Sequence, residues 1–192
     1  MAKKKKDTSK NRLILGITLL VFGLILVFGK PRESLKTDVS LSDYTFAKEP
    51  VKVQGFDKSE QSENNIPKRI IIPKLLIDLE VKRAKIVRGF WEVFLDSAGW
   101  GEGSGTAGEA GNQVIFAHAR EGLFLPLKNI KNGERIYVLT EDKWYSYQVV
   151  EIKEVFPNQT EVIAATDDER LTLYTCSGFS DSKRLIAIAK RI

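Results

Sequence analysis

Apolar and polar positions divide this chain into an apolar run near the N-terminus, a polar stretch and a long region of short alternating segments. The apolar run covers residues 13–29 and is interrupted only by glycines and Thr18. Its 17 residues are at the short end of the length that a helix needs to cross a bilayer. A buried core helix normally carries a polar stripe, which this run lacks. The run therefore predicts one transmembrane helix.

The residues on either side of the apolar run indicate its orientation. Residues 30–33 follow it without the Ala-x-Ala pattern of a cleavage site, which favours an uncleaved signal anchor over a cleaved signal peptide. The lysine-rich residues 1–12 precede it, and basic flanks stay in the cytoplasm. We therefore predict a single-pass protein of the cell membrane, with a basic cytoplasmic tip at 1–12, the anchor at 13–29 and the remainder extracellular. The polar residues 30–66 are predicted to form a flexible extracellular stem.

Short β-like segments continue from residue 67 to the C-terminus. Their apolar residues are β-branched or alternate with polar ones, and turn pairs such as Asn132-Gly133 separate them. The predicted strands are 69–73, 76–81, 113–117, 135–139, 144–155, 171–176 and 184–189. Seven or eight short strands within residues 67–192 favour a closed or nearly closed β-barrel, and thus a mostly β fold class.

Two connections between the predicted strands differ in character. Residues 99–111 contain six glycines and no regular pattern, so a long mobile loop is predicted there. Glu102 and Glu109 lie in this stretch and are interpreted as solvated acids rather than metal ligands. Residues 123–128 are predicted to form a short helical turn, whose length Pro126 limits.

The net charge of +5 is concentrated at one end of the chain. Residues 1–12 contain six basic residues and one acidic residue, which accounts for the whole excess (6 − 1 = +5). The remainder is neutral, whereas a nucleic-acid-binding face needs clustered basic residues. We therefore predict no nucleic-acid partner. A hydrophobic content of 43% is enough for a packed core.

The only cysteine and the only histidine of the chain, Cys176 and His118, each stand where a strand-like segment ends. Strand alternation places Cys176 on one face with Thr172 and Tyr174. Arg184 follows eight positions after the cysteine, beyond a loop of seven residues. If the two flanking strands are antiparallel neighbours, Cys176 and Arg184 meet at one edge. If the strand before His118 runs parallel to the cysteine strand, the histidine emerges there too.

These three side chains have the chemistry of a cysteine nucleophile and its partners. A thiol has an ordinary pKa of about 8.5, so it needs an imidazole to take its proton and a cation to favour the thiolate. A fixed guanidinium donates hydrogen bonds to the oxyanion that forms after attack on a carbonyl carbon. Each residue also has a structural interpretation, in which Cys176 is a core thiol, His118 a satisfied core side chain and Arg184 a solvated charge.

Three segments of the chain resemble the sortases, the membrane-anchored cysteine transpeptidases of bacterial cell envelopes. Residues 172–176, TLYTC, match the TLxTC signature of that family. Residues 112–138, NQVIFAHAREGLFLPLKNIKNGERIYV, resemble the segment in which the catalytic histidine follows a strand and precedes a short helix. Residues 69–81, RIIIPKLLIDLEV, resemble the first strands of the sortase barrel. The order His, Cys, Arg is also the order of the family.

The resemblance implies a closed eight-stranded barrel with short helices over residues 67–192, preceded by one N-terminal transmembrane helix. It makes Cys176 the nucleophile, His118 the acid and base, and Arg184 the group that binds substrate and stabilises the oxyanion. Ala117 and Thr175 would support the substrate or the oxyanion. Surface proteins with a C-terminal LPxTG-like sorting signal would be the substrates. The amine acceptor would be a peptidoglycan precursor or a pilin lysine.

Two positions depart from the commonest family pattern. Ala117 stands where many sortases have glycine, and the interval of eight residues from Cys176 to Arg184 is short for the housekeeping enzymes with a calcium site. No metal or cofactor is therefore expected. Two alternative functions remain open from the sequence: a membrane-tethered cysteine peptidase that transfers its acyl group to water, and a peptide-binding β-barrel without catalysis.

Overall fold

The computed structural model of this chain describes residues 14, 16–19 and 63–192. Residues 14 and 16–19 are helical. The predicted cytoplasmic tip, most of the predicted anchor and most of the predicted stem lie outside the described residues. Across the described ranges, no helix combines the length and the apolar character that a membrane span requires.

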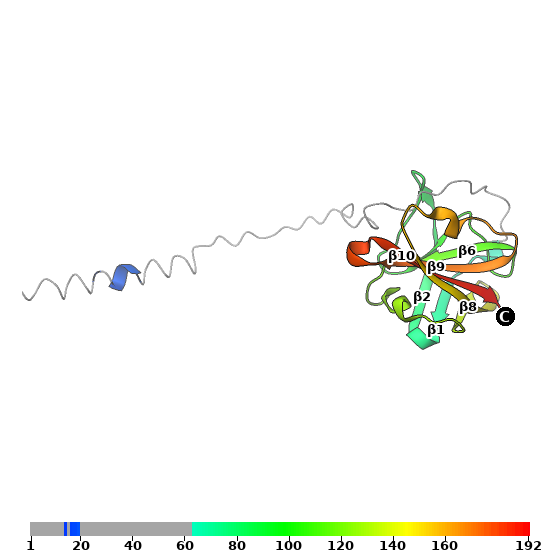
Figure 1. Cartoon of the computed structure of the whole chain (residues 1–192), viewed down its shortest axis with the longest axis horizontal. Coiled ribbons are helices and arrows are strands. Elements are labelled where there is room, and N and C mark those ends of the chain that lie inside the picture. The colour runs from blue at the N-terminus through cyan, green and yellow to red at the C-terminus, as the bar shows by residue number, and fades with distance from the viewer. Residues whose placement is uncertain (1–13, 15, 20–62) are drawn as a thin grey trace, which may run out of the picture. The chain divides into compact units, whose positions relative to one another are not determined.

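Eight strands close into a barrel in the order β1-β2-β5-β6-β9-β10-β8-β7, which confirms the predicted mostly β, barrel-forming class. Figure 1 shows β9 between β6 and β10. The barrel strands are β1 Arg69–Ile72, β2 Ile77–Ala84, β5 Ala98–Gly101, β6 Gly111–Phe116, β7 Arg135–Leu139, β8 Trp144–Val155, β9 Glu169–Ser177 and β10 Lys183–Arg191. The short strands β3 Ile86–Val87 and β4 Phe90–Trp91 pair only with each other.

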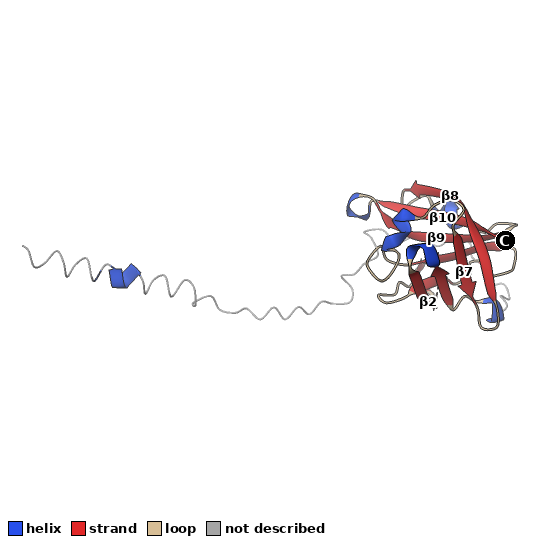
Figure 2. Ribbon diagram, turned by 90° about the horizontal axis from the view of Figure 1, so that it is seen from below, coloured by secondary structure: helices blue, strands red, loops and turns tan. Residues whose placement is uncertain are grey.

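The helices of the barrel domain are short 3₁₀ segments, of which η2 precedes the first strand and the others lie in the connections between strands (Figure 2). They are η2 Glu63–Asn65, η3 Pro73–Leu75, η4 Leu125–Asn129, η5 Thr160–Ile163 and η6 Phe179–Asp181. The helical turn predicted at 123–128 is η4, and its proline stands in the first turn, where a missing N–H costs no hydrogen bond. Ile66, at the end of the predicted stem, is buried in the barrel core.

Strand alternation divides the buried side chains into two layers. Leu171 and Leu173 of β9 point into the barrel and pack in the inner core with Trp100 and Ile136. Cys176 lies in a second cluster, on the outer face of the same strands. The other buried members of this outer cluster are Ala84, Trp91, Val114, Phe116, Val155, Val162, Ile163, Tyr174, Ile186 and Ile188. Strands β9 and β10 are therefore buried on both faces, which keeps the site on rigid backbone.

Part of the glycine-rich stretch is a strand rather than the mobile loop that we predicted. Strand β5 pairs parallel with β2 and antiparallel with β6, and all four of its residues are buried. A Cβ atom on Gly99 would lie 2.9 Å from the Phe116 ring, and one on Gly101 would lie 2.4 Å from the Trp91 ring. These two rings stack with their centroids 5.6 Å apart. The glycines therefore admit aromatic rings against the backbone instead of providing mobility.

Replacing Gly101 with alanine is expected to lower the free energy of unfolding by about 1–3 kcal/mol, because the added methyl group overpacks the site of the Trp91 ring. Chemical denaturation monitored by tryptophan fluorescence measures the change. Glu80→Ala, at an exposed position of β2, is the control and should shift the unfolding free energy by less than about 0.5 kcal/mol. Equal stability of Gly101→Ala and the parent would show that Trp91 moves without cost.

Hydrogen bonds hold the remainder of the glycine-rich stretch. Glu109 accepts from Asn65 Nδ2 at 2.8 Å and from Thr106 Oγ1 at 2.6 Å, so it is a structural acceptor rather than the solvated acid that we expected. Glu102 lies 3.8 Å from the Arg83 guanidinium. The Gly108 N–H donates to the Glu169 carboxylate at 2.9 Å. The loop is thereby tied to both the start of the domain and the start of β9.

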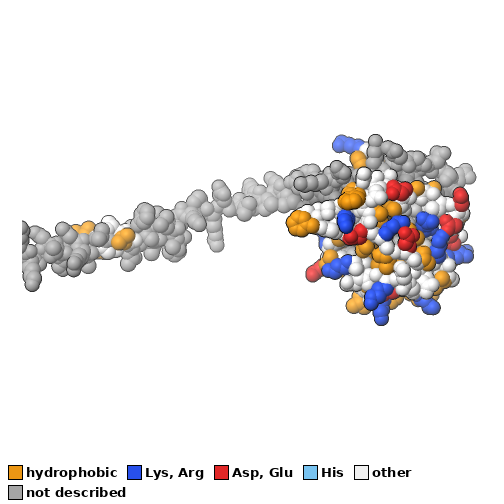
Figure 3. All heavy atoms as spheres, in the orientation of Figure 1, with side chains coloured by type: hydrophobic (Ala, Val, Ile, Leu, Met, Phe, Trp, Pro, Cys, Tyr) orange, Lys and Arg blue, Asp and Glu red, His pale blue; other side chains and the backbone are white. Residues whose placement is uncertain are grey.

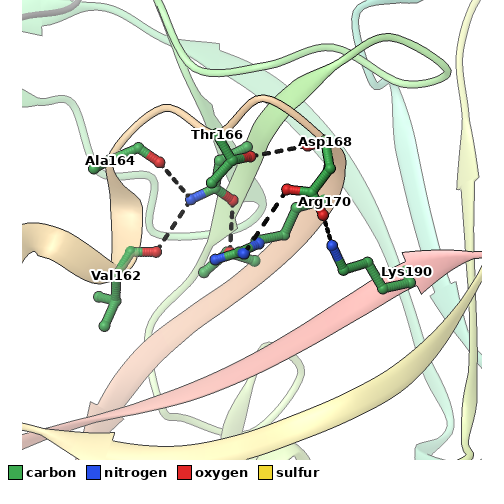
Figure 4. Close-up of polar contacts among 8 residues, drawn as sticks. Val162, Ala164, Thr166, Asp168, Arg170 and Lys190 are labelled. Carbon is green, nitrogen blue, oxygen red and sulfur yellow. Dashed lines mark hydrogen bonds and ion pairs between the residues drawn. The ribbon is translucent and has the colours of Figure 1, made fainter.

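The connection from β8 to β9 is fastened to the outer face of the barrel (Figure 4). The buried Asn112 amide donates to the carbonyls of Val162 at 3.1 Å and Ala164 at 2.9 Å, and its oxygen accepts from the Thr172 hydroxyl at 2.6 Å. At the end of the connection, Asp168 forms ion pairs with Lys190 and with Arg170. These contacts place η5 over the outer cluster that contains the cysteine.

Candidate active site

Parallel pairing of β6 with β9 brings the histidine to the end of the barrel where the cysteine stands. Phe116 is the register partner of Tyr174, and the pairing continues with the Ala117 N–H donating to the Tyr174 carbonyl at 3.3 Å. His118 is the next residue, so its backbone emerges beside Cys176. Thr175 Oγ1 donates to the Ala117 carbonyl at 2.8 Å, which fastens the two strand ends together.

Antiparallel pairing of β9 with β10 places Arg184 directly opposite Cys176 in the register. The two strands extend further than predicted, because Ser177 and Lys183 also pair, and the connection therefore contains residues 178–182 rather than the seven residues expected. Ser180 and Asp181 both have left-handed backbones, with φ of 51° and 58°. This backbone is costly for residues other than glycine, and such strain is often found near functional sites.

The guanidinium of Arg184 is fully buried, with 0% of the residue exposed. Its Nε donates to the Tyr174 hydroxyl at 3.0 Å. Its Nη1 donates to the carbonyls of Asp181 at 2.7 Å and Lys183 at 2.8 Å. Buried polar groups require such partners, and donors with a formal charge make the stronger bonds. The orientation of this guanidinium is therefore set by contacts at two of its nitrogens.

A pocket of about 320 Å³ gives access to Cys176, which is otherwise buried with 6% of the residue exposed. One side of the pocket is the segment after His118, which folds back because the Phe124 N–H donates to the His118 carbonyl at 3.0 Å. The residues lining the pocket are Ala119, Phe124, Leu125, Lys128, Glu154, Thr175, Cys176, Ser177, Gly178, Asp181 and Leu185. The pocket therefore has an apolar side, several charged groups and a sulfur atom in its wall.

Burial opposes charge on both candidate groups. Burial raises the pKa of the Cys176 thiol, the Arg184 charge opposes that rise, and the Asp181 carboxylate adds to it. Burial, followed by the positive charge of Arg120, lowers the pKa of His118, and Asp181 opposes this effect. The neutral thiol and neutral imidazole are therefore the dominant forms near neutral pH, and the thiolate–imidazolium pair is a minor form.

The sequence interpretation missed two residues that the structure adds to the site. Tyr174 contacts Arg184, and strand alternation had already placed it on the cysteine face, so its position was a usable signal. Asp181 contributes its carbonyl to Arg184 and its charge to both titrating groups. No signal in the sequence indicates the direction of that carbonyl. Ala117 packs in the inner core, whereas Thr175 lines the pocket.

Over the residues that the structure describes, no group of three or more His, Cys, Asp or Glu side chains is arranged to hold a metal ion. Basic and acidic side chains are interspersed over the face of the barrel domain seen in Figure 3.

Known proteins match this chain both in sequence and in fold. A family model described as the sortase domain matches residues 70–192, and the chain belongs to the sortase family. Sortases are cysteine transpeptidases. Sortase A of Streptococcus agalactiae serotype III (strain NEM316) is 28% identical over 211 residues, covering 93% of this chain and 83% of that protein. Sortase A of Bacillus anthracis is 26% identical over 205 residues, covering 94% of this chain and 95% of that protein.

Solved structures of sortases have the same fold. Sortase C of Streptococcus pneumoniae superposes with a TM-score of 0.60 at 26% identity, over 75% of this chain and 80% of that chain. Sortase A of Corynebacterium diphtheriae gives a TM-score of 0.56 at 25% identity, over 70% of this chain and 63% of that chain. The likeness therefore includes sortases that carry the A name and sortases that carry the C name.

Proposed function

We propose that Cys176, His118 and Arg184 carry out the transpeptidation of this sortase on an LPxTG-like sorting signal. The observation that carries the proposal is the register of two strand pairings. Antiparallel β10 sets Arg184 opposite Cys176, and parallel β6 delivers His118 to the same end of the barrel. Three residues with complementary chemistry thus lie at the same end of three neighbouring strands, with Cys176 in β9, Arg184 in β10 and His118 two residues beyond the end of β6.

The first half of the reaction forms a thioester. His118 takes the proton of the Cys176 thiol, and the sulfur attacks the carbonyl carbon of the peptide bond after the threonine of the sorting signal. The oxyanion accepts hydrogen bonds from the Arg184 guanidinium. The C–N bond then breaks, and the imidazolium of His118 protonates the leaving amine. The part of the sorting signal that begins with the glycine is released with the new amine, and the part that ends with the threonine remains as an acyl group on sulfur.

The second half transfers that acyl group. A neutral amine attacks the thioester carbon, His118 takes the proton lost by the amine, and the C–S bond breaks to return the thiolate, which regains its proton from the imidazolium. Thr175 and Ala117 support both steps by holding the ends of β9 and β6 together through their hydrogen bond. An acyl acceptor of this kind would be a peptidoglycan precursor amine or a pilin lysine.

We further propose that residues 13–29 anchor the enzyme in the cell membrane as a single-pass protein. The basic residues 1–12 would stay in the cytoplasm and the barrel would act outside, where surface proteins carrying a C-terminal sorting signal are exported. This proposal rests on the apolar run and its basic flank. It agrees with membership of a family whose members act at the cell surface.

Incubation of the full chain in detergent with an LPxTG peptide and triglycine tests the function, with products identified by mass spectrometry. A ligated product, with the glycine of the signal replaced by triglycine, is expected. Hydrolysis alone, with the amine present in excess, would instead indicate a cysteine peptidase. Binding of the peptide without either product would indicate a peptide-binding barrel.

The pH dependence of kcat/KM is expected to be a broad bell, because the Cys176 thiol and the His118 imidazole must together hold one titrating proton. The rate rises as pH increases through the pKa of His118, which lies below its ordinary value, so the acid limb falls below about pH 6.5. The rate falls as pH increases through the pKa of Cys176, which lies above its ordinary value, so the alkaline limb lies above about pH 8.5.

Arg120→Gln should move only the acid limb, toward higher pH, because the positive charge of Arg120 lowers the pKa of His118. Arg135→Gln, at the exposed first position of β7, is the matched control and should leave both limbs in place. An acid limb that stays in place in Arg120→Gln would mean that another group controls it.

A further inference from the structure

Arg184 is held from two sides, by a tyrosine of the cysteine strand and by the turn that follows that strand. We propose that Tyr174 is a positioning residue that fixes the Arg184 guanidinium against the oxyanion, with the left-handed turn at Ser180–Asp181 as its second support. The inference rests on the proposed role of Arg184. It assigns a positioning role to the third residue of the TLYTC motif, Tyr174, which stands at the variable position of the TLxTC signature.

The strand register explains how Tyr174 reaches Arg184. Cys176 is the direct partner of Arg184 across β9 and β10, and Tyr174 stands two residues earlier on the same face of β9, opposite Ile186. Tyr174 is therefore a diagonal neighbour of Arg184, at a distance that long or aromatic side chains can span. The phenol extends along the sheet toward the end that carries the cysteine, and its oxygen lies 3.0 Å from Nε.

Burial makes this contact both rigid and strong. Tyr174 is 5% exposed and packs in the outer cluster with Phe116 and Ile186, so its ring has little freedom to move. A hydrogen bond to a charged donor in such surroundings is stronger than one in water. Removing the Tyr174 hydroxyl would take this acceptor away from the buried Arg184 Nε and should therefore disturb the orientation of the guanidinium.

The phenol is also an acceptor without charge. Burial raises the pKa of Tyr174 to about 12, although the Arg184 charge opposes the rise, so the hydroxyl stays protonated at physiological pH. A carboxylate in the same place would offset the positive potential that an oxyanion needs. A neutral phenol orients the guanidinium and leaves its charge available.

The turn supplies the second point of attachment. The Asp181 carbonyl accepts from Nη1 at 2.7 Å, and the left-handed backbones at Ser180 and Asp181 set the direction of that carbonyl. A planar guanidinium held at Nε and at Nη1 has a fixed plane, which determines the direction of all its N–H bonds. Fixed donors stabilise an oxyanion better than mobile ones, because they need no reorganisation during the reaction.

A double-mutant cycle tests the proposal with the full chain, the LPxTG peptide and triglycine. Tyr174→Phe keeps the ring and removes only the hydroxyl, and kcat should fall roughly tenfold with KM close to that of the parent. In an Arg184→Lys background the same change should alter kcat less than about twofold, because lysine has no Nε to hold. Rates are normalised to the folded fraction from thermal unfolding.

Tyr147→Phe is the matched control, because that buried tyrosine donates to Glu169, outside the residues that line the pocket. It should leave kcat unchanged. A Tyr174→Phe enzyme as fast as the parent, while Arg184→Lys is slow, would overturn the positioning role alone. Equal losses from Tyr174→Phe in both backgrounds would also overturn it, since the tyrosine would then act independently of Arg184. Parental activity in Arg184→Lys would remove the role of the arginine and the inference with it.

Discussion

Cys176→Ala is expected to lose all peptide cleavage and all acyl transfer, down to the uncatalysed background. The chain has no second cysteine, and an alanine side chain cannot form the thioester on which both halves of the reaction depend. Neither His118 nor Arg184 can compensate, because both act on bonds that the sulfur makes. The loss should therefore be complete in kcat rather than a change in KM.

The fold of this variant should survive. Cys176 contributes one sulfur atom at the edge of the outer cluster, beside a pocket that is already open, so its removal creates little new cavity. The expected cost is about 1 kcal/mol of unfolding free energy, small compared with the stability of a domain. Thermal unfolding by circular dichroism and peptide binding by calorimetry should both resemble those of the parent.

Mass spectrometry of the protein mixed with peptide supplies the direct measurement for Cys176. The parent should show an adduct of acyl mass at low acceptor concentration, and Cys176→Ala should show none. Ser146→Ala on β8, whose side chain is outside the pocket, is the control and should form the adduct normally. Turnover by Cys176→Ala would rule out the thiol as nucleophile, and an unfolded variant would favour a structural role for the sulfur.

Arg184→Lys is expected to lower kcat roughly 10²–10³-fold, the usual effect of removing an oxyanion donor. Lysine retains the positive charge, so the variant tests geometry more than electrostatics. A single ammonium cannot reproduce the contacts that Nε makes with Tyr174 and that Nη1 makes with the Asp181 carbonyl. The ammonium would also be drawn to the carbonyls of the turn and away from the oxyanion.

Alkylation of Cys176 by iodoacetamide separates the two stages at which Arg184→Lys can act. Thiolate formation depends on nearby positive charge, which lysine supplies, so the alkylation rate should change much less than kcat. Arg191→Lys, on the same strand but paired with Glu169, is the matched control and should change kcat less than twofold. If alkylation and turnover fall together, the arginine acts on thiolate formation instead of on the oxyanion.

Much of the barrel could be predicted because strand patterns are local. Seven of the barrel strands follow alternating or β-branched segments, and the two faces of β9 were assigned correctly from alternation. Strand β5 was missed because its glycines have no side-chain pattern. Their purpose is visible only when the rings of Trp91 and Phe116 lie over them.

The sequence alone determined the local chemistry and the strand periodicity. It shows one cysteine, one histidine and an arginine at the ends of strand-like segments, and motifs that resemble the sortases. Both features depend on residue type and on the covalent geometry of an extended backbone. Pairing of β6 with β9 is different, because strands far apart in the chain align only when the whole barrel closes. The contact of Tyr174 with Arg184 and the direction of the Asp181 carbonyl likewise arise from packing between strands and from one strained turn.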